Sequence, residues 1–506
     1  MNKKKTVFYV SLGISLFLIG LGVIMPKQLE RFSNNFLEFI YDYLGWLLLS
    51  SVFFFFVFCL FLSFSRFGRI RLGDDNDRPH YPTITWIAML FSASIGISLV
   101  FWGVAEPVSY YIDPPFGEAY TAESAKTAMQ FVYLHWGVSA WSCYALVGVC
   151  LAYFQFRQKL PSALSSAFYP VLGEGIRGPI GKTIDIITIL SIVIGVATSL
   201  GFGTLQVNTG MQVLWDIPNN FTIQLTIILS LTFVYLWSAT TGLNRGIKYL
   251  SNINMLLSLA LIGFILFLGP TQTIFKIFFQ GIADYTNNFL GMSFRTEPYS
   301  KGTWIASWTL FYFGWWIAWA PLVGSFVARI SKGRTIREFM MGALFIPVIA
   351  SFFWFAVLGG SALYFIHNLG HITIAQAVKE DVTVALFTFF NYFPLSFIIS
   401  IVAMVLILIY FVTSADSAIF VLGMVSENGN QYPSKKIKII WGVIIAAVAA
   451  VLLVTGGLKG LQSALVATAI PLSILLLFLC YSMYKGLSAD VDSSSVTIST
   501  EKASKK

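Results

Sequence analysis

The chain has 506 residues, of which 57% are hydrophobic and only 11% are charged, and its formal net charge is +9. Soluble domains carry about 25% charged residues, so this composition excludes a water-soluble protein and predicts an all-α polytopic membrane protein. Since no basic patch is large enough for nucleic acid, we interpret the positive charge as a topology signal and an attraction to anionic membrane lipid.

Twelve apolar runs are long enough to cross a bilayer, which takes about 20 residues. In chain order they cover residues 7–25, 43–65, 85–110, 127–154, 184–209, 221–239, 250–269, 303–328, 338–363, 384–412, 439–456 and 461–484. An even number of spans places both termini on one side. The segments on that side hold 24 of the 32 Lys and Arg residues, and such residues collect in the cytoplasm. We expect twelve transmembrane helices with both termini cytoplasmic.

Three of these runs carry small residues or proline at mid-membrane depth, where a helix would break. The stretches are "SASIGIS" (92–98), "GVATSLGFG" (195–203) and "FGWWIAWAPLVGSF" (313–326). Lipid cannot satisfy the backbone groups that a break frees, so breaks are tolerated only against protein or a wet cavity. Spans 3 and 8 lie five spans apart, as do spans 5 and 10, which share the pairs Thr198-Ser199 and Thr413-Ser414. This spacing predicts an inverted-repeat transporter site; the alternative is that the small residues pack helices.

Two aromatic sets lie near the middle of spans 4 and 8. They are Trp136, Trp141 and Tyr144, and Trp315, Trp316 and Trp319. At 100° per residue each set falls on one face of its helix. An interfacial belt accounts for Trp304 and Trp308 at the outer start of span 8 but not for rings at mid-span. Helix packing remains the alternative for each ring taken singly.

Ring faces are suited to a quaternary ammonium group, which has no N–H to donate. Cation–π attraction supplies about 2 kcal/mol for a desolvated ring, and such a box avoids a costly carboxylate at the bilayer centre. Neither aromatic set contains an acid. The two sets therefore predict a binding box for a quaternary ammonium compound.

Several motifs resemble the betaine–choline–carnitine transporter family, and most of all the glycine betaine transporters of Gram-positive bacteria. They are "LVFWGVAEP" (99–107), "HWGVSAWSCY" (135–144), "GIKYLSN" (246–252), "FYFGWWIAWAPLVGSFVARISKGRTIREF" (311–339) and "VTSADSAIFVLG" (412–423). The resemblance implies a five-plus-five inverted-repeat core like that of the amino-acid/sodium symporters, with two extra N-terminal helices. It also implies a homotrimer in the bacterial cell membrane.

The expected organisation has five parts. They are an N-terminal region with spans 1 and 2 and a cytoplasmic loop (1–84), repeat 1 with spans 3–7 (85–269), an amphipathic surface helix and outer loop (270–302), repeat 2 with spans 8–12 (303–484) and a cytoplasmic tail (485–506).

The resemblance carries over a substrate site and a sodium site. The substrate residues it implies are Trp136, Trp141, Tyr144, Phe311, Trp315, Trp316 and Trp319, with Ser94, Gly96 and Ser98 in span 3, where the family often has three glycines. The sodium ligands it implies are the hydroxyls of Thr413 and Ser414 and the backbone carbonyls of Ser92, Ile95 and Tyr410. No cofactor is expected beyond the transported sodium ion.

The predicted function is a secondary active symporter, not an enzyme, that imports glycine betaine with sodium for protection against osmotic stress. The alternatives are a choline or carnitine carrier, proton coupling, or sodium-independent exchange. A channel would need a continuous polar pore, a membrane enzyme would need clustered acid–base or metal groups, and a pump would need a nucleotide motif. The sequence leaves open the substrate among these compounds, the number of sodium ions, osmotic regulation and the role of Asp416.

Overall fold

The computed structural model describes residues 5–94, 96–241, 244–299 and 303–504, without the side chains of 93–94, 244–248 and 492–504. Over this part of the chain the fold is helical, and its β-structure is one isolated bridge between Arg71 and Thr335. The N-terminal region forms α1 (Thr6–Ile24), α2 (Pro26–Phe39), η2 (Ile40–Leu44), α3 (Gly45–Phe64) and η3 (Arg66–Arg69).

The next region corresponds to the first predicted repeat. Its elements are α4 (Thr83–Ser94), α5 (Ile97–Ile112), α6 (Ala122–Trp136), α7 (Val138–Ala152), η4 (Tyr153–Arg157), η5 (Leu164–Phe168), α8 (Tyr169–Leu172), η6 (Gly173–Arg177), α9 (Pro179–Trp215), α10 (Phe221–Thr241) and α11 (Asn244–Leu268).

The C-terminal region begins with the predicted surface helix, α12 (Thr271–Ser293). The elements after it are η7 (Ala306–Leu310), α13 (Phe311–Ile330), α14 (Ile336–Phe355), η8 (Ala356–Gly360), α15 (Ser361–His367), α16 (Thr373–Glu380), η9 (Val382–Val384), α17 (Ala385–Phe390), α18 (Ser396–Ser426) and α19 (Lys435–Ser504).

By length and composition, ten helices of the described chain can cross a membrane, or eleven when the bent pair α4 and α5 counts as one span. The 70-residue helix α19 contains a non-helical residue, Gly457, which joins two helices at a kink. Each predicted run therefore coincides with a helix, a pair of helices or one half of α19. The polytopic all-α class is confirmed, while the count of twelve stays a prediction.

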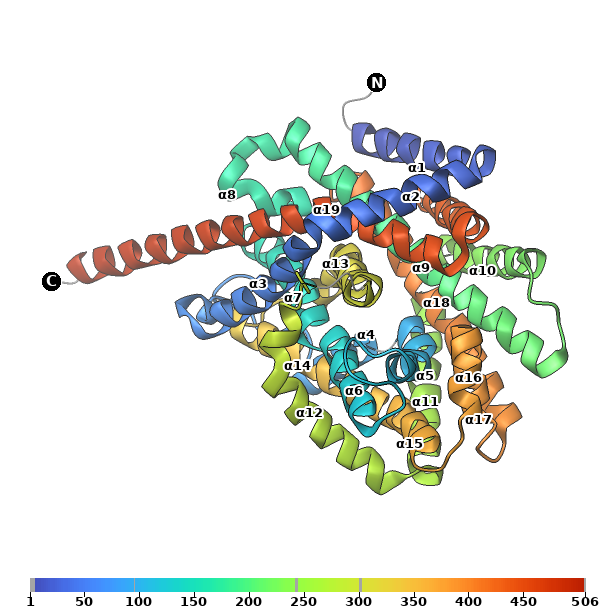
Figure 1. Ribbon diagram of the computed structural model, residues 1–506. Helices are drawn as coiled ribbons and strands as arrows, with labels where there is room; N and C mark the ends of the chain where they lie inside the picture. The colour runs from blue at the N-terminus through green and yellow to red at the C-terminus, as the bar shows by residue number, and fades with distance from the viewer. Residues whose placement is uncertain (1–4, 95, 242–243, 300–302, 505–506) are drawn as a thin grey trace.

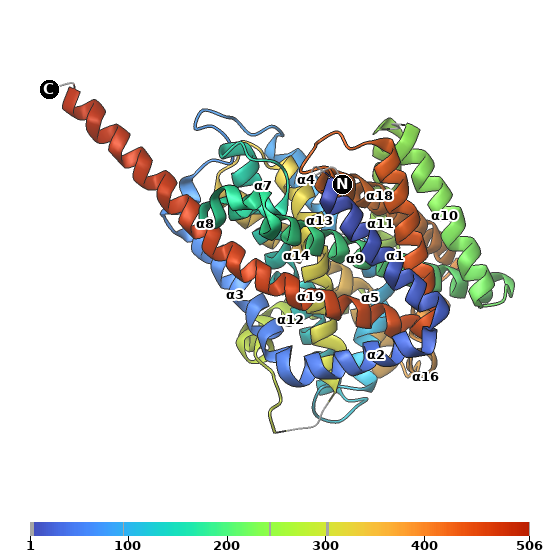
Figure 2. The ribbon, with the colours of Figure 1, turned by 90° about the horizontal axis from the view of Figure 1, so that it is seen from above.

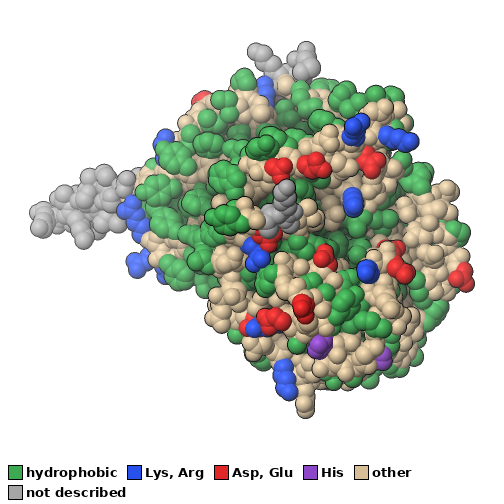
Figure 3. Space-filling model, viewed as in Figure 1, with side chains coloured by type: hydrophobic (Ala, Val, Ile, Leu, Met, Phe, Trp, Pro, Cys, Tyr) green, Lys and Arg blue, Asp and Glu red, His purple; other side chains and the backbone are tan. Residues whose placement is uncertain are grey.

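Helix α13 lies at the centre of the helical body, where α7, α9 and α19 pack against it (Figure 1). Helix α12 runs along the outside, and the C-terminal end of α19 projects away from the body (Figure 2). In the same view as Figure 1, charged side chains are scattered over the visible face, and hydrophobic side chains gather mainly on its left and upper parts (Figure 3).

The predicted break in span 3 is confirmed. Helix α4 ends at Ser94, α5 begins at Ile97 after the extended residue Gly96, and the two segments are bent by 59°. The breaks predicted in spans 5 and 8 are wrong, because α9 and α13 run through these stretches without interruption, with Pro321 inside α13. Span 10 is continuous from Ser396 onward, through Thr413 and Ser414, after a separate short helix α17.

Close packing explains the small residues of the uninterrupted helices. A Cβ atom on Gly324 of α13 would lie 2.9 Å from the backbone nitrogen of Gly148 on α7, so these two glycines let the helices approach. A Cβ atom on Gly195 of α9 would lie 2.9 Å from the Trp319 ring. Small residues at such positions are the usual means of helix association in membranes.

A break that the sequence analysis missed divides span 4 instead. Helix α6 ends at Trp136 and α7 begins at Val138, with the non-helical Gly137 between them. A Cβ atom on Gly137 would lie 2.3 Å from the Tyr133 carbonyl oxygen, so only glycine fits this corner. The break separates Trp136 from Trp141 and thereby sets the directions of the two indoles independently.

Candidate functional site

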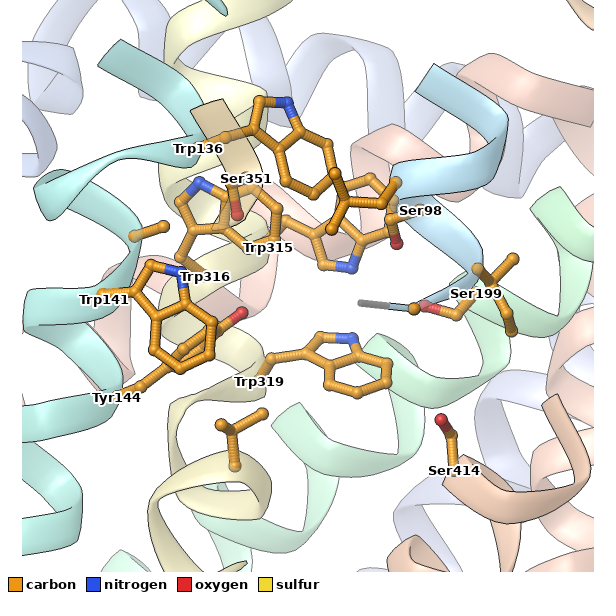
Figure 4. A pocket seen from close by; sticks show the side chains of 15 residues that line it. Ser98, Trp136, Trp141, Tyr144, Ser199, Trp315, Trp316, Trp319, Ser351 and Ser414 are labelled. Carbon is orange, nitrogen blue, oxygen red and sulfur yellow. The ribbon is translucent and has the colours of Figure 1, made fainter. Parts of the chain in front are cut away.

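A cavity of about 110 Å³ lies between the two breaks, beside the middle of α13. It is lined by Gly96, Ile97, Ser98 and Leu99 of α5 and its N-cap, Trp136 of α6, Ala140, Trp141 and Tyr144 of α7, Ser199 of α9, Trp315, Trp316, Trp319 and Val323 of α13, Ser351 of α14 and Ser414 of α18 (Figure 4). None of these described lining residues carries a charge.

Aromatic rings form one wall of the cavity. The Trp315 and Trp316 rings are stacked, with centroids 5.5 Å apart and planes 8° from parallel. Trp136 meets Trp316 edge to face at 4.8 Å, and Trp141 meets Tyr144 edge to face at 5.2 Å. The arrangement presents ring faces and edges from three helices to one small volume, which is what a compact cation without N–H groups requires.

Two hydrogen bonds fix this wall from behind. Trp136 Nε1 donates to Oε2 of Glu106 at 2.6 Å, and Trp316 Nε1 donates to the carbonyl oxygen of His135 at 2.7 Å. The indole N–H groups therefore point away from the cavity toward fixed acceptors. Only apolar ring surface of these two residues is left to face a ligand.

Hydroxyl groups and a helix N-terminus form the opposite side, where Ser98, Ser199 and Ser414 lie across from Trp141 and Tyr144 (Figure 4). Ser199 Oγ donates to the Gly195 carbonyl of its own helix at 3.3 Å. Helix α5 begins here, with Gly96 as its N-cap. The N–H groups of a first helical turn have no partner within the helix and favour an anion.

Two polar atoms near the rings lack partners within the described chain. Ser351 Oγ and Trp319 Nε1 are buried without a hydrogen bond, and both residues line the cavity. A buried donor left unpaired costs about 1–3 kcal/mol. These two donors are therefore available to a polar group of a bound molecule.

The structure brings most of the predicted substrate residues together. Eight of them line the cavity: Trp136, Trp141, Tyr144, Trp315, Trp316, Trp319, Gly96 and Ser98. Phe311 is not among the lining residues; its ring packs on Trp315 at 5.3 Å and supports the wall from outside. The Ser94 side chain lies outside the described residues.

The predicted sodium residues fall on α4 and α18, and Ile95 lies outside the described residues. Ser414 lines the cavity. Thr413 Oγ1 donates to the carbonyls of Ile409 and Tyr410 in its own helix, both at 3.1 Å. In this structure Thr413 thus has the back-bonded arrangement that is common for threonine in helices, which uses the hydroxyl hydrogen and leaves the oxygen lone pairs to coordinate an ion.

Trp304 is not a belt residue. Only 8% of its surface is exposed, and its Nε1 donates to the Asp113 carbonyl at 2.8 Å. Its ring packs 4.8 Å from both Tyr110 and Phe131. The position of a tryptophan at a span end predicts a belt, but the fold of α5 and α6 covers this one.

Sequence analysis also missed residues that the structure places in or behind the cavity. Ser351 lines it, Gly137 shapes it, and Glu106 holds Trp136. Ser199 of the Thr-Ser pair in span 5 also lines it, although it was not named as a binding residue. Glu106 carried a usable signal as well, because an acid within an apolar run marks a functional candidate. Its partners lie on other helices, so the sequence could not identify them.

The described residues, with ten or eleven helices able to cross a membrane and an aromatic cavity among them, have the architecture of a polytopic membrane protein. Residues 6–492 match the family model described as "BCCT, betaine/carnitine/choline family transporter". The chain belongs to the betaine/carnitine/choline transporter family, and it is a transporter and not an enzyme.

Three relatives are similar over nearly their full lengths. A glycine betaine transporter of Bacillus subtilis is 45% identical over 96% of this chain and 94% of its own. A probable glycine betaine transporter of Desulfitobacterium hafniense is 43% identical over 97% and 98%. An ectoine/hydroxyectoine transporter of Virgibacillus pantothenticus is 42% identical over 96% and 98%.

Proposed function

We propose that this protein is a secondary symporter that imports glycine betaine with sodium as an osmoprotectant. The cavity carries the proposal, because it is uncharged and two-sided. Ring faces on α7 and α13 suit the trimethylammonium group, and Ser98 with the first turn of α5 suits a carboxylate. Glycine betaine carries both groups within one small zwitterion.

Choline is the second candidate, since the family description includes it. Its cationic end would occupy the same rings, but it has a hydroxyl group in place of the carboxylate. The hydroxyl side of the cavity would then lose a charge-assisted hydrogen bond, which contributes about 1.5–3 kcal/mol. Glycine betaine should therefore bind ahead of choline.

Sodium supplies the driving force in this proposal. Glycine betaine has no net charge, so the membrane potential alone does not concentrate it. Each sodium ion that enters gains about 2.3 kcal/mol per 100 mV, which corresponds to roughly fortyfold accumulation. The proposed ion site lies between the α4–α5 break and α18, where Ser414 already reaches the cavity.

Helix packing supports the proposed five-plus-five repeat. Helix α7 of span 4 packs on α13 of span 8, and α14 of span 9 packs on α4 of span 3. Helix α9 of span 5 packs on α19, where Thr198 donates to the carbonyl of Leu461 at the start of span 12, while α18 of span 10 packs on α11 of span 7. In an inverted repeat each span of the first half corresponds to the span five places later in the second half. The contact between spans 4 and 8 then corresponds to that between spans 9 and 3, and the contact between spans 5 and 12 to that between spans 10 and 7, as a two-fold relation requires.

We also propose that the protein lies in the bacterial cytoplasmic membrane with both termini inside, and that it forms a homotrimer. The loop charges support the orientation. For the trimer, α12 offers a surface helix with exposed Phe275, Phe279 and Leu290. Crosslinking in membranes and accessibility of terminal tags would test these two points.

One uptake experiment tests the central proposal. Purified protein in proteoliposomes should accumulate labelled glycine betaine under an inward sodium gradient, and should lose most uptake when potassium replaces sodium at fixed potential. Unlabelled glycine betaine, choline, carnitine and ectoine then compete for uptake. Equal uptake without sodium would exclude the coupling, and stronger competition by choline or ectoine would reassign the substrate.

A further inference from the structure

A buried acid and a buried histidine lie directly behind the aromatic wall. The side chains of Glu106 on α5 and His135 on α6 are fully buried, and Glu106 Oε1 lies 3.0 Å from His135 Nδ1. Neither residue lines the cavity. Replacing a buried pair of this kind by apolar residues is often neutral or stabilising, so stability alone does not explain it.

Both residues hold tryptophans of the cavity wall. The second carboxylate oxygen of Glu106 accepts from Trp136 Nε1 at 2.6 Å, and the backbone carbonyl of His135 accepts from Trp316 Nε1 at 2.7 Å. These two indoles meet edge to face at 4.8 Å. The Trp136 ring is therefore held by the carboxylate of the buried pair, while the adjacent Trp316 ring is held by the backbone of α6.

The pair is itself fixed on its far side. His135 Nε2 lies 3.1 Å from Thr309 Oγ1, and Tyr110 Oη lies 3.1 Å from His135 Nδ1. The Tyr312 ring stacks on the imidazole at 4.7 Å. With these contacts the imidazole cannot turn, and the carboxylate has little freedom to leave the indole of Trp136.

We propose that Glu106 is a positioning residue for quaternary ammonium binding, acting through the indole N–H of Trp136. The carboxylate holds the Trp136 ring in the orientation that presents its surface to the cavity. A charged acceptor also shifts electron density in the indole toward the ring, which strengthens attraction to a cation. This inference rests on the proposed function, since it concerns how the same cavity holds its ligand.

The first test is Glu106→Gln, which keeps the size of the side chain and removes its charge. Binding of glycine betaine and of tetramethylammonium is measured on purified protein by tryptophan fluorescence, and uptake is measured in proteoliposomes. We expect the Kd of both compounds and the KM of uptake to rise at least tenfold, while the maximal rate stays within about twofold. An unchanged Kd would overturn the inference.

Asp185→Asn is the matched control, because Asp185 is another buried acid of a spanning helix. Its carboxylate accepts hydrogen bonds from Ser165 and does not touch the cavity. The control should leave the Kd of both compounds unchanged. A tenfold rise in the control would show that loss of any buried carboxylate perturbs binding, and would overturn a specific role for Glu106.

A double-mutant cycle with Trp136→Phe shows whether Glu106 acts through the indole N–H. Phenylalanine keeps a ring but has no donor, so Trp136→Phe alone should weaken binding about tenfold, and Glu106→Gln should add less than twofold to it. If Glu106→Gln weakens binding by the same factor in the Trp136→Phe background as in the parent protein, the mechanism is overturned. If Glu106→Gln does not fold, unchanged binding by Trp136→Phe overturns it alone.

The fluorescence of the ligand-free protein separates this inference from the proposed function. Glu106→Gln should change the tryptophan emission, and the change should vanish in the Trp136→Phe background. If the parent protein binds neither compound but this difference is present, the proposed function is wrong, and only the part of the inference that Glu106 orients the Trp136 ring stands. If the difference persists without Trp136, the positioning role is wrong whatever the substrate.

Discussion

The two sides of the cavity each contain a broken helix, but the breaks are built differently. At Gly137, beside the ring wall, an added Cβ atom would lie 2.3 Å from the Tyr133 carbonyl and 3.0 Å from Tyr285 Oη. At Gly96, beside the hydroxyl groups, an added Cβ atom would meet nothing within 4 Å. One break is crowded and the other is open.

The hydrogen bonds of the ring wall and of the hydroxyl side also differ. The indole N–H groups of Trp136 and Trp316 reach acceptors on other helices, whereas Ser199 and Thr413 bond back to their own helices. The ring wall is thus preorganised for a cation. On the hydroxyl side, Ser199 would have to release the Gly195 carbonyl before it could donate to an anion.

The largest effect is expected from a substitution at the crowded break, at Gly137. Gly137→Ala forces its methyl group against backbone and should cost about 1–3 kcal/mol, seen as a lower unfolding midpoint in detergent. Gly96→Ala is the matched change at the open break and should leave the midpoint unchanged. Equal destabilisation by the two substitutions would remove the distinction between the breaks.

Removing rings tests the preorganised wall. Trp316→Ala or Trp319→Ala should weaken glycine betaine binding at least tenfold, about 1.4 kcal/mol, because one desolvated cation–π contact supplies about 2 kcal/mol. The control is Trp237→Ala, since Trp237 is 58% exposed on α10. Isothermal titration with purified protein provides the Kd, and full affinity in both ring variants would identify the rings as packing only.

Removing the hydroxyls of Thr413 and Ser414 on α18 tests the proposed sodium site. Thr413→Ala combined with Ser414→Ala should raise the sodium concentration for half-maximal uptake about tenfold and leave the ring wall intact. Uptake is measured against external sodium at fixed potential. Binding of tetramethylammonium in the absence of sodium serves as the control. A sodium requirement equal to that of the parent would place the ion elsewhere.

The smallest effect concerns selectivity. Ser98→Ala removes one hydroxyl from the first turn of α5 and should weaken glycine betaine severalfold, because about 1 kcal/mol is typical for one hydrogen bond. Choline lacks the carboxylate and should bind unchanged. Competition for labelled glycine betaine gives both constants. A parallel loss for the two compounds would show that Ser98 shapes the cavity without recognising the carboxylate.

Composition and periodicity by themselves determined the membrane class and the aromatic face of α13 in this protein. Long apolar runs predict spanning helices because lipid leaves no other way to satisfy the backbone. The α13 set was predicted correctly as a face because helical geometry is local. The other set also lines the cavity, but not as one helical face, because the break at Gly137 separates Trp136 from Trp141. The break at Gly96 was also predicted from local sequence, since small residues surround it on both sides.

Only the tertiary structure decided what the other glycines do. Gly324 and Gly195 looked like breaks, but each leaves room for a neighbour, Gly148 on α7 and the Trp319 ring. Gly137, which does sit at a break, has no local feature that distinguishes it. The role of Glu106 was hidden for the same reason, since its partner Trp136 lies 30 residues away on another helix. Close approach and buried hydrogen bonds depend on which helices pack together, and no single run of sequence contains that information.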